Sequence, residues 1–221
     1  MHPYLEPLAE RFAAKADAAN AAAMRAYMKD VAPFFGVKTV ERRALLKALL
    51  AEQGKATFAE LPAIARSAFA QPEREWHYMA VDLLVMHAKK LGPEHLPLLE
   101  ELITTKSWWD TVDALATNVV GVVLKRYPKE MPYWNERWVG SEDMWLVRTS
   151  ILFPLKWRHE TDQALLFGNI ERHVGHTNFF ILKAIGWALR QYGRTEPEAV
   201  RAFVATRKLS PLSAREALRS L

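Results

Sequence analysis

Aromatic residues recur at a regular interval near the beginnings of predicted helices, and this repeat constrains the fold more than any other feature. Trp76, Trp109, Trp145 and Phe180 are separated by 33, 36 and 35 residues. Each precedes a largely apolar stretch, and a shorter amphipathic helix is predicted before it. Paired helices with a period of roughly 34 to 47 residues are typical of α-solenoids. We therefore predict an all-α fold, a HEAT-like helical repeat solenoid with a concave basic face.

Glycine and proline residues punctuate the chain in agreement with this repeat. Gly54, Gly92, Gly140, Gly175 and Gly193 are expected to end or separate helices. Because no Ser/Gly-rich linker interrupts the pattern, residues 1–221 are predicted to form a single domain. Helices are predicted over residues 3–15, 19–28, 39–52, 57–70, 74–90, 93–105, 107–127, 128–139, 143–156, 161–173, 177–192, 196–205 and 210–220.

The composition excludes several classes of protein. There is no cysteine, which excludes disulfides, thiolate metal sites and cysteine nucleophiles and is typical of a reducing cytosol. Apolar runs end before the roughly 18 to 20 residues that a membrane span needs, and no secretory signal is recognisable. We therefore expect a cytoplasmic protein without a membrane segment. Thirty Lys and Arg against 25 Asp and Glu give a net charge of +5, which favours a polyanionic partner.

The segment from Lys106 to Asp113 reads KSWWDTVD and is the most informative part of the sequence. Ser107 is predicted to cap the following helix. Adjacent residues on a helix point about 100° apart, so Trp108 is expected to join the apolar stripe of the helix while Trp109 does not. Trp109 instead shares its face with Asp113, four residues later. An aromatic ring and a carboxylate are therefore predicted to project together.

Arg148 lies in an otherwise apolar helix and needs an anionic partner, because burying an unpaired guanidinium costs several kcal/mol. Asp113 in the preceding repeat is one candidate partner. A phosphate is another, since the planar guanidinium can bind it through two hydrogen bonds. In the purely structural alternative, Trp109 packs between repeats and Asp113 only neutralises an arginine.

A basic face interrupted by an aromatic ring is predicted for the helix over residues 177–192. Lys183, Trp187 and Arg190 lie at positions i, i+4 and i+7, an arrangement that suits a phosphate backbone beside a stacking surface. A solvated basic face with a half-buried tryptophan is the structural alternative. The predicted DNA-binding surface also includes Phe180, Lys156 and Arg194.

Tyr27 lies between Arg25 and Lys29 and places a further aromatic ring among cations. No phosphate-binding glycine loop, zinc-protease motif or hydrolase nucleophile motif is present. The histidines are scattered, and no carboxylate cluster completes a ligand set. We therefore expect no metal and no cofactor.

Three segments carry a family resemblance: TTKSWWDTVDALATNVVG, WLVRTSILFPL and FFILKAIGWALRQYGRTEPEAVRAFV. They resemble the AlkD-type DNA alkylation repair enzymes, which are HEAT-like-repeat DNA glycosylases, and the likeness covers nearly the whole chain. By this resemblance Trp109 and Asp113 match a tryptophan and an aspartate essential for base excision. Arg148 matches an arginine near the lesion phosphate, Trp187 a second aromatic residue of the site and Tyr27 a third.

The resemblance implies excision of positively charged N3- and N7-alkylated purines, such as 3-methyladenine and 7-methylguanine, from duplex DNA. The charged base already is a good leaving group, so one carboxylate suffices to stabilise the oxocarbenium-like sugar and to position water. The lesion would be captured on an open concave surface, and we expect a monomer. Two alternatives stay open: a HEAT-like scaffold that binds DNA or protein without catalysis, and a solenoid that binds RNA or tRNA.

Overall fold

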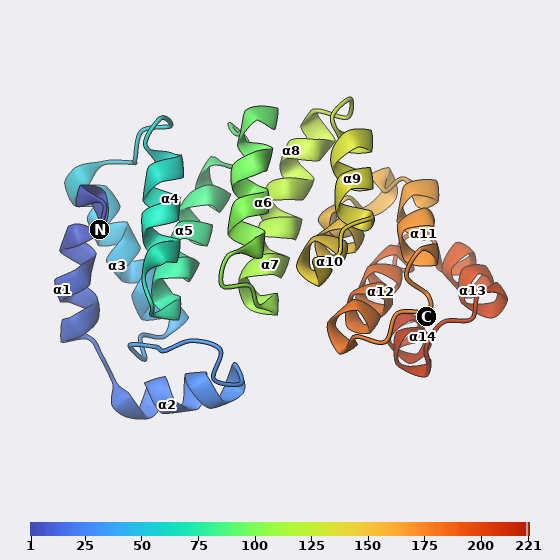
Figure 1. The fold of residues 1–221 in the computed structure, drawn as a ribbon, viewed down its shortest axis with the longest axis horizontal. Coiled ribbons are helices and arrows are strands. Elements are labelled where there is room, and N and C mark those ends of the chain that lie inside the picture. The colour runs from blue at the N-terminus through green and yellow to red at the C-terminus, as the bar shows by residue number, and fades with distance from the viewer. Residues whose placement is uncertain (220) are drawn as a thin grey trace. The chain divides into compact units, whose positions relative to one another are not determined.

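The computed structural model describes residues 1–219 and residue 221, and all regular structure in these residues is helical (Figure 1). The predicted all-α fold is confirmed. The residues divide into two compact units, Met1–His87 and Ala88–Leu221, which we describe separately. The assignment of residues 1–221 to a single domain stays a prediction. Among the described helices, none is long and apolar enough to cross a membrane.

The first unit consists of a short 3-10 turn and five α-helices. Phe12 and Trp76 pack edge to face at its centre, with 4.7 Å between their ring centroids. Both are almost completely buried, so this contact joins the first helix to the last. The predicted helix over residues 57–70 begins only at Leu61, and the helix over residues 74–90 ends at His87. The elements are η1 (Pro3–Leu5), α1 (Glu6–Ala14), α2 (Ala18–Tyr27), α3 (Thr39–Gln53), α4 (Leu61–Ala70) and α5 (Arg74–His87).

A buried carboxylate organises the loop between α2 and α3. Glu75 accepts hydrogen bonds from the backbone N–H groups of Phe35, Gly36 and Val37, at 3.1, 2.8 and 3.1 Å. Gly36 has φ +90°, and a Cβ there would lie 2.1 Å from the carbonyl oxygen of Asp17. Only glycine therefore allows this close approach. The loop holds α2, which itself buries no side chain.

The second unit consists of helices that follow one another in pairs, as the aromatic repeat predicts. Packed pairs include α9 with α10 and α12 with α14. Trp109, Trp145 and Phe180 each lie in the first turn of a helix. The elements are η2 (Pro93–His95), α6 (Leu96–Thr104), α7 (Trp109–Leu115), η3 (Ala116–Val120), α8 (Gly121–Arg126), α9 (Met131–Val139), α10 (Met144–Leu152), η4 (Phe153–Lys156), η5 (Arg158–Glu160), α11 (Gln163–Glu171), α12 (Phe179–Tyr192), α13 (Pro197–Thr206) and α14 (Pro211–Leu218).

Several predicted helices in this unit differ from the structure. The helix expected over residues 143–156 ends at Leu152 and is followed by the 3-10 turn η4. The single helix expected over residues 107–127 is interrupted by the π-helical turn η3, between α7 and α8. The helix expected over residues 210–220 ends at Leu218, and Ser220 lies outside the described residues. A π turn widens the helix by one residue, and periodicity does not reveal it because the apolar pattern continues on both sides.

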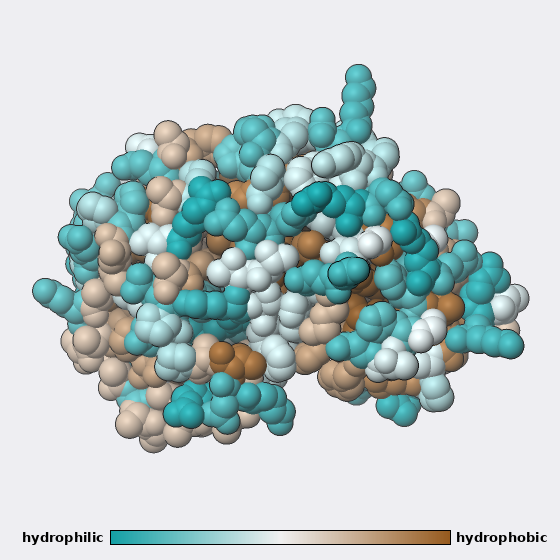
Figure 2. All heavy atoms as spheres, in the orientation of Figure 1, coloured by the Kyte–Doolittle hydropathy of each residue, from teal (hydrophilic) through white to brown (hydrophobic). Residues whose placement is uncertain are grey.

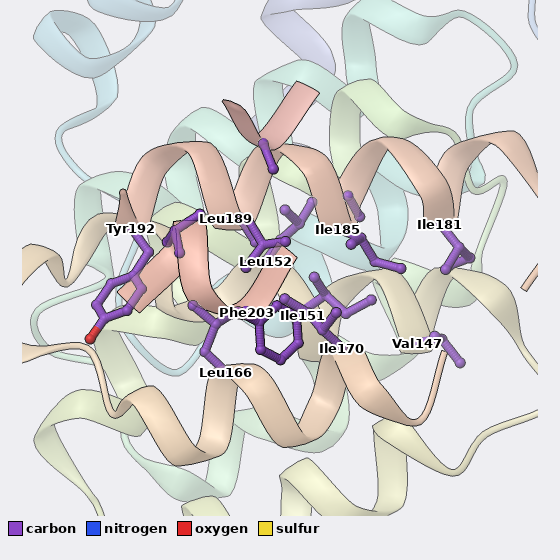
Figure 3. Close-up of a cluster of buried hydrophobic side chains, with 14 of the residues drawn as sticks. Val147, Ile151, Leu152, Leu166, Ile170, Ile181, Ile185, Leu189, Tyr192 and Phe203 are labelled. Atoms are coloured by element: carbon purple, nitrogen blue, oxygen red, sulfur yellow. The ribbon is translucent and has the colours of Figure 1, made fainter. Parts of the chain in front are cut away.

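Figure 3 shows the packing that joins consecutive helix pairs of the second unit. Ile181, Ile185 and Leu189 form one stripe of α12 and face side chains of α10 and α11, including Ile151 and Ile170. All five residues are at most 1% exposed. Each fully buried aliphatic side chain contributes about 1.5–3 kcal/mol relative to its exposed state. The core therefore consists of stripes from successive helices, as expected for stacked repeats.

Ion pairs repeat along the shorter helices of the second unit. A glutamate of one helix accepts from an arginine about 36 residues later, which lies in the next shorter helix or directly after it. Each arginine is partly exposed, so each pair stabilises the fold by at most about 1 kcal/mol. The pairs are Glu100 with Arg137 at 2.6 Å, Glu136 with Arg172 at 2.7 Å, and Glu171 with Arg207 at 2.7 Å.

Two buried asparagines link α9 to α11. Asn135 Nδ2 donates to Asn169 Oδ1 at 2.9 Å, and Asn169 Nδ2 donates back to Asn135 Oδ1 at 2.7 Å. Asn169 Nδ2 also donates to the carbonyl of Ser150 on α10. Buried polar groups of this kind favour the one register in which all of them are satisfied.

We expect Asn135→Ala to lower the free energy of unfolding by about 1–3 kcal/mol, because it leaves the buried amide of Asn169 with one partner fewer. Urea unfolding followed by circular dichroism measures this change. Asn135→Asp retains an acceptor but adds a buried charge, and it should destabilise more than alanine does. An unchanged unfolding midpoint in both variants would contradict a structural role for the amide pair.

Candidate active site

The helix that carries Trp109 and Asp113 begins one residue later than a Ser107 cap requires. Ser107 Oγ donates to the carbonyl of Ile103 at 2.6 Å, so the predicted N-cap role of Ser107 is wrong. Trp108 instead is the residue before the first helical turn, in an extended conformation and without a capping side chain. Because the hydroxyl of Ser107 is bonded to the previous helix, it does not cap α7, and α7 begins after Trp108. Trp109 and Asp113 still lie one turn apart on α7 and share a face.

The predicted pairing of Arg148 with Asp113 is present in the structure. Arg148 Nε donates to Asp113 Oδ1 and Nη2 donates to Oδ2, both at 2.7 Å. The remaining nitrogen, Nη1, donates to the carbonyl of Phe180. Three helices therefore converge on one guanidinium: α7, α10 and α12. Each of the three nitrogens of Arg148 donates to a protein group, and its side chain is only 4% exposed.

The carboxylate of Asp113 is enclosed but remains in contact with solvent, since 13% of its side chain is exposed. Burial raises the pKa of Asp113 above its ordinary value, and the charge of Asp110 adds to this effect. The hydrogen bonds and the charge of Arg148 oppose it. Two of the four lone-pair positions of the carboxylate are occupied by Arg148, which leaves further positions for an external group.

The π turn η3 directly follows the helix of Asp113. Thr117 Oγ1 donates to the carbonyl of Asp113 at 2.8 Å, and Asn118 Nδ2 donates to that of Ala114 at 2.9 Å. A Cβ on Gly121, at the start of α8, would lie 2.1 Å from the carbonyl oxygen of Phe153, so only glycine allows η4 to pack this closely. The backbone around Asp113 is therefore held by side chains as well as by helical hydrogen bonds.

Three aromatic rings form a cluster that includes Phe180, whose carbonyl accepts from Arg148. The Trp108 ring packs against Trp145 at 5.8 Å and against Phe180 at 4.9 Å between centroids, and Trp145 and Phe180 lie 5.1 Å apart. Among the described residues, the indole nitrogen of Trp108 is buried without a hydrogen-bond partner. The Phe180 ring therefore belongs to this cluster, while its carbonyl holds Arg148.

The basic face of α12 is partly neutralised by a residue that sequence reasoning missed. Glu216 of α14 pairs with Lys183 at 3.0 Å and with Arg190 at 2.8 Å. A Cβ on Gly186 would meet the Glu216 side chain at 2.5 Å, so the two helices approach closely there. Trp187 remains 37% exposed. No local pattern identifies Glu216, because its partners lie 26 and 33 residues earlier in the sequence.

The other predicted binding residues are Lys156, Arg194 and Tyr27. Lys156, in η4, donates to the side chain of Asn118. Arg194 is exposed just after the end of α12. Tyr27, at the end of α2, is 70% exposed and belongs to the first unit, and its place in a common site with Asp113 stays a prediction. Within the described residues, no group of three or more histidines or carboxylates is arranged to hold a metal ion.

The chain is similar to known proteins over nearly its full length. Residues 8–221 match the family described as DNA alkylation repair enzyme. A solved structure, a predicted DNA alkylation repair enzyme from Enterococcus faecalis, superimposes with a TM-score of 0.87 at 33% sequence identity. The match covers 93% of this chain and 96% of that one. No curated protein sequence matches the chain.

Proposed function

The chain belongs to the family of DNA alkylation repair enzymes, and on that basis we propose that it is a DNA glycosylase. Its substrates are positively charged purines alkylated at N3 or N7, of the 3-methyladenine and 7-methylguanine type, in duplex DNA. The observation that carries the proposal is the Asp113 carboxylate, held by two hydrogen bonds from Arg148 and still 13% exposed. The carboxylate is therefore fixed in position while part of it stays open to an external group.

The proposed reaction is hydrolysis of the bond between the sugar C1′ and the base nitrogen. The electron pair of this bond leaves with the base, which thereby becomes neutral and needs little help from a general acid. The sugar becomes oxocarbenium-like, and the fixed negative charge of Asp113 stabilises it. Water then bonds to C1′ and passes a proton to Asp113, from which it reaches solvent.

Arg148 acts in this proposal as a positioning residue. Its two hydrogen bonds fix both oxygens of Asp113, and the donation to the carbonyl of Phe180 fixes the guanidinium itself. Preorganised charge is effective because no reorientation is needed when the sugar becomes cationic. We assign Arg148 no contact with a DNA phosphate, since its side chain is only 4% exposed.

Trp109 and Trp187 supply the proposed preference for damaged bases. A cationic base held against an indole face gains about 0.5–2 kcal/mol from each ring, and a neutral base does not gain this charge-dependent part. Trp109 shares its helix face with Asp113, and Trp187 is partly exposed on α12. Tyr27 is proposed as a third aromatic contact, and the enzyme is proposed to act as a monomer.

Release of free base from methylated duplex DNA tests the proposed function. Wild-type protein is expected to liberate 7-methylguanine or 3-methyladenine, detected by chromatography, and to leave an abasic site. A protein that binds the duplex without releasing base would instead support the non-catalytic scaffold. Preference for single-stranded RNA over duplex DNA in a competition assay would support the RNA-binding alternative.

The pH dependence of base release reports on the ionisation of Asp113. Only the carboxylate is active in this proposal, so the rate falls as pH drops through the pKa of Asp113, which burial raises. Asp110→Asn removes a charge that contributes to the raised pKa, so the acidic limb of the profile should move to lower pH. Single-turnover rates between pH 4 and 8 measure this shift. A shift to higher pH would contradict the assignment.

A further inference from the structure

The arginines of the second unit fall into two groups: those that pair with protein groups and those that are available to bind a ligand. Most guanidinium groups there donate to a carboxylate or a carbonyl of the protein, and Arg148 and Arg190 are examples. In the part of the chain that the structure describes, no hydrogen bond or ion pair engages the side chains of Arg158 and Arg194. In the view of Figure 2, hydrophilic residues form much of the surface over this unit. The available cations therefore differ from those that helical spacing indicates.

Arg158 has an unusual backbone conformation. It is the first residue of η5 and has φ +57°, in the left-handed region that residues other than glycine rarely adopt. Its neighbours hold this turn: Trp157 is buried, and its Nε1 donates to the carbonyl of Gly121 at 3.0 Å. The N–H of Thr161 donates to the carbonyl of Arg158 at 3.0 Å. Such conformations are frequent at ligand-binding positions, where the surrounding structure maintains them.

The side chain of Arg158 borders an open hollow of about 510 Å³ between η4 and α12. The hollow is lined by Leu155, Lys156, Arg158 and Gln191, so its polar groups are two cations and an amide, without a carboxylate. The Gln191 amide has no hydrogen-bond partner among the described residues. A guanidinium and an amide together offer several N–H donors to one anion.

Gln191 connects this hollow to the proposed lesion site. It lies four residues after Trp187 on α12, which corresponds to about 6 Å along the helix. A DNA strand whose base contacts Trp187 would therefore bring a backbone phosphate near the hollow. Lys183 and Arg190 lie on the same helix, but Glu216 already neutralises part of their charge.

We propose that the hollow formed by Lys156, Arg158 and Gln191 binds a phosphate of the DNA backbone, with Arg158 as its principal ligand. The inference rests on the proposed function, because it takes duplex DNA as the ligand. A guanidinium that has no carboxylate partner loses none when it binds a phosphodiester through two hydrogen bonds. Arg190 would have to give up or share its contact with Glu216. The phosphate contact therefore depends more on Arg158 than on Arg190.

The salt dependence of DNA binding tests the proposal. Dissociation constants for an undamaged duplex are measured by fluorescence anisotropy between 50 and 300 mM salt for wild type, Arg158→Gln and Arg158→Gly. Each lost phosphate contact lowers the slope of log K against log salt by about 0.9. Arg158→Gly also suits the left-handed backbone, so its folding is not at risk. We expect both variants to bind several-fold more weakly and to have this smaller slope.

Arg215→Gln is the matched control, because Arg215 is exposed on α14 and its loss removes one positive charge elsewhere in the same unit. It should leave the slope near the wild-type value. An unchanged slope in the Arg158 variants, or a fall equal to that of Arg215→Gln, would overturn the proposal. Binding of inorganic phosphate that depends on Arg158 while the DNA slope does not would also overturn it, because the site would then serve free phosphate.

Failure of the phosphate site can be distinguished from failure of the proposed glycosylase function. Base release from methylated DNA by the wild-type protein reports on Asp113, whereas the salt slope of the Arg158 variants is measured on undamaged DNA. A wild-type protein that releases no base, together with the expected change of slope, would refute the glycosylase function and leave the phosphate site standing. Normal base release with an unchanged slope would refute only the phosphate site.

Discussion

Asp113→Asn is expected to reduce the single-turnover rate of base release about 100- to 1,000-fold, the usual cost of removing one preorganised electrostatic contact to a transition state. The substitution keeps the size of the side chain and one acceptor for Arg148, but it removes the charge that would stabilise the sugar cation. Affinity for duplex DNA should stay the same or increase, because a negative charge is lost from the site. The measurement is the rate of 7-methylguanine release, with binding measured separately.

Asp162→Asn serves as the matched control for this experiment. Asp162 caps α11 by accepting from the N–H of Leu165, and asparagine caps equally well. The control variant should therefore release base at the wild-type rate. Activity of Asp113→Asn close to that of wild type would refute the role proposed for the carboxylate.

Arg148→Ala is expected to lower the free energy of unfolding by about 3–5 kcal/mol, because it leaves the enclosed carboxylate of Asp113 without its partner. The carbonyl of Phe180 loses its donor as well. Base release should also fall strongly, since the carboxylate is no longer oriented. Urea unfolding at neutral pH measures the stability. Arg148→Lys keeps the charge without the paired hydrogen bonds and should give intermediate values of both quantities.

A double variant separates the structural contribution of the pair from its proposed contribution to catalysis. Replacing a buried ion pair with apolar residues of similar volume is often neutral or stabilising, so Asp113→Leu with Arg148→Met should recover much of the lost stability. It should still release no base. Recovered activity in the double variant would show that neither residue takes part in the reaction.

The sequence determined those parts of the site that lie within one helix. The positions of Trp109 and Asp113 follow from a spacing of four residues, and helical geometry alone places them on one face. The sequence also predicted that Arg148 needs an anion, because it lies among apolar residues, but it left Asp113 and a phosphate open as the partner. The structure selects Asp113, 35 residues earlier. The helical spacing of the apolar residues predicted the all-α fold, and the period of the aromatic residues predicted the helical repeat.

The capping of α7 and the π turn could not be predicted from local pattern. As an N-cap, Ser107 would accept from a backbone N–H of the following helix, yet its hydroxyl donates to the carbonyl of Ile103 in the preceding helix. The π turn η3 continues the apolar pattern of the helices on both sides, so periodicity does not distinguish it from an α-helix. In both cases local propensity allowed two solutions, and packing against neighbouring helices selected one.

Tertiary structure alone decided which cations are available to a ligand. Lys183 and Arg190 have helical spacing suited to a phosphate backbone, but α14 brings Glu216 between them. Arg158 has no such pattern, yet a left-handed turn presents it at an open hollow. The sequence specifies how many charges there are and which of them share a helix. Which charges neutralise one another depends on how helices distant in sequence pack, because electrostatic interactions are governed by distances of a few ångström in space.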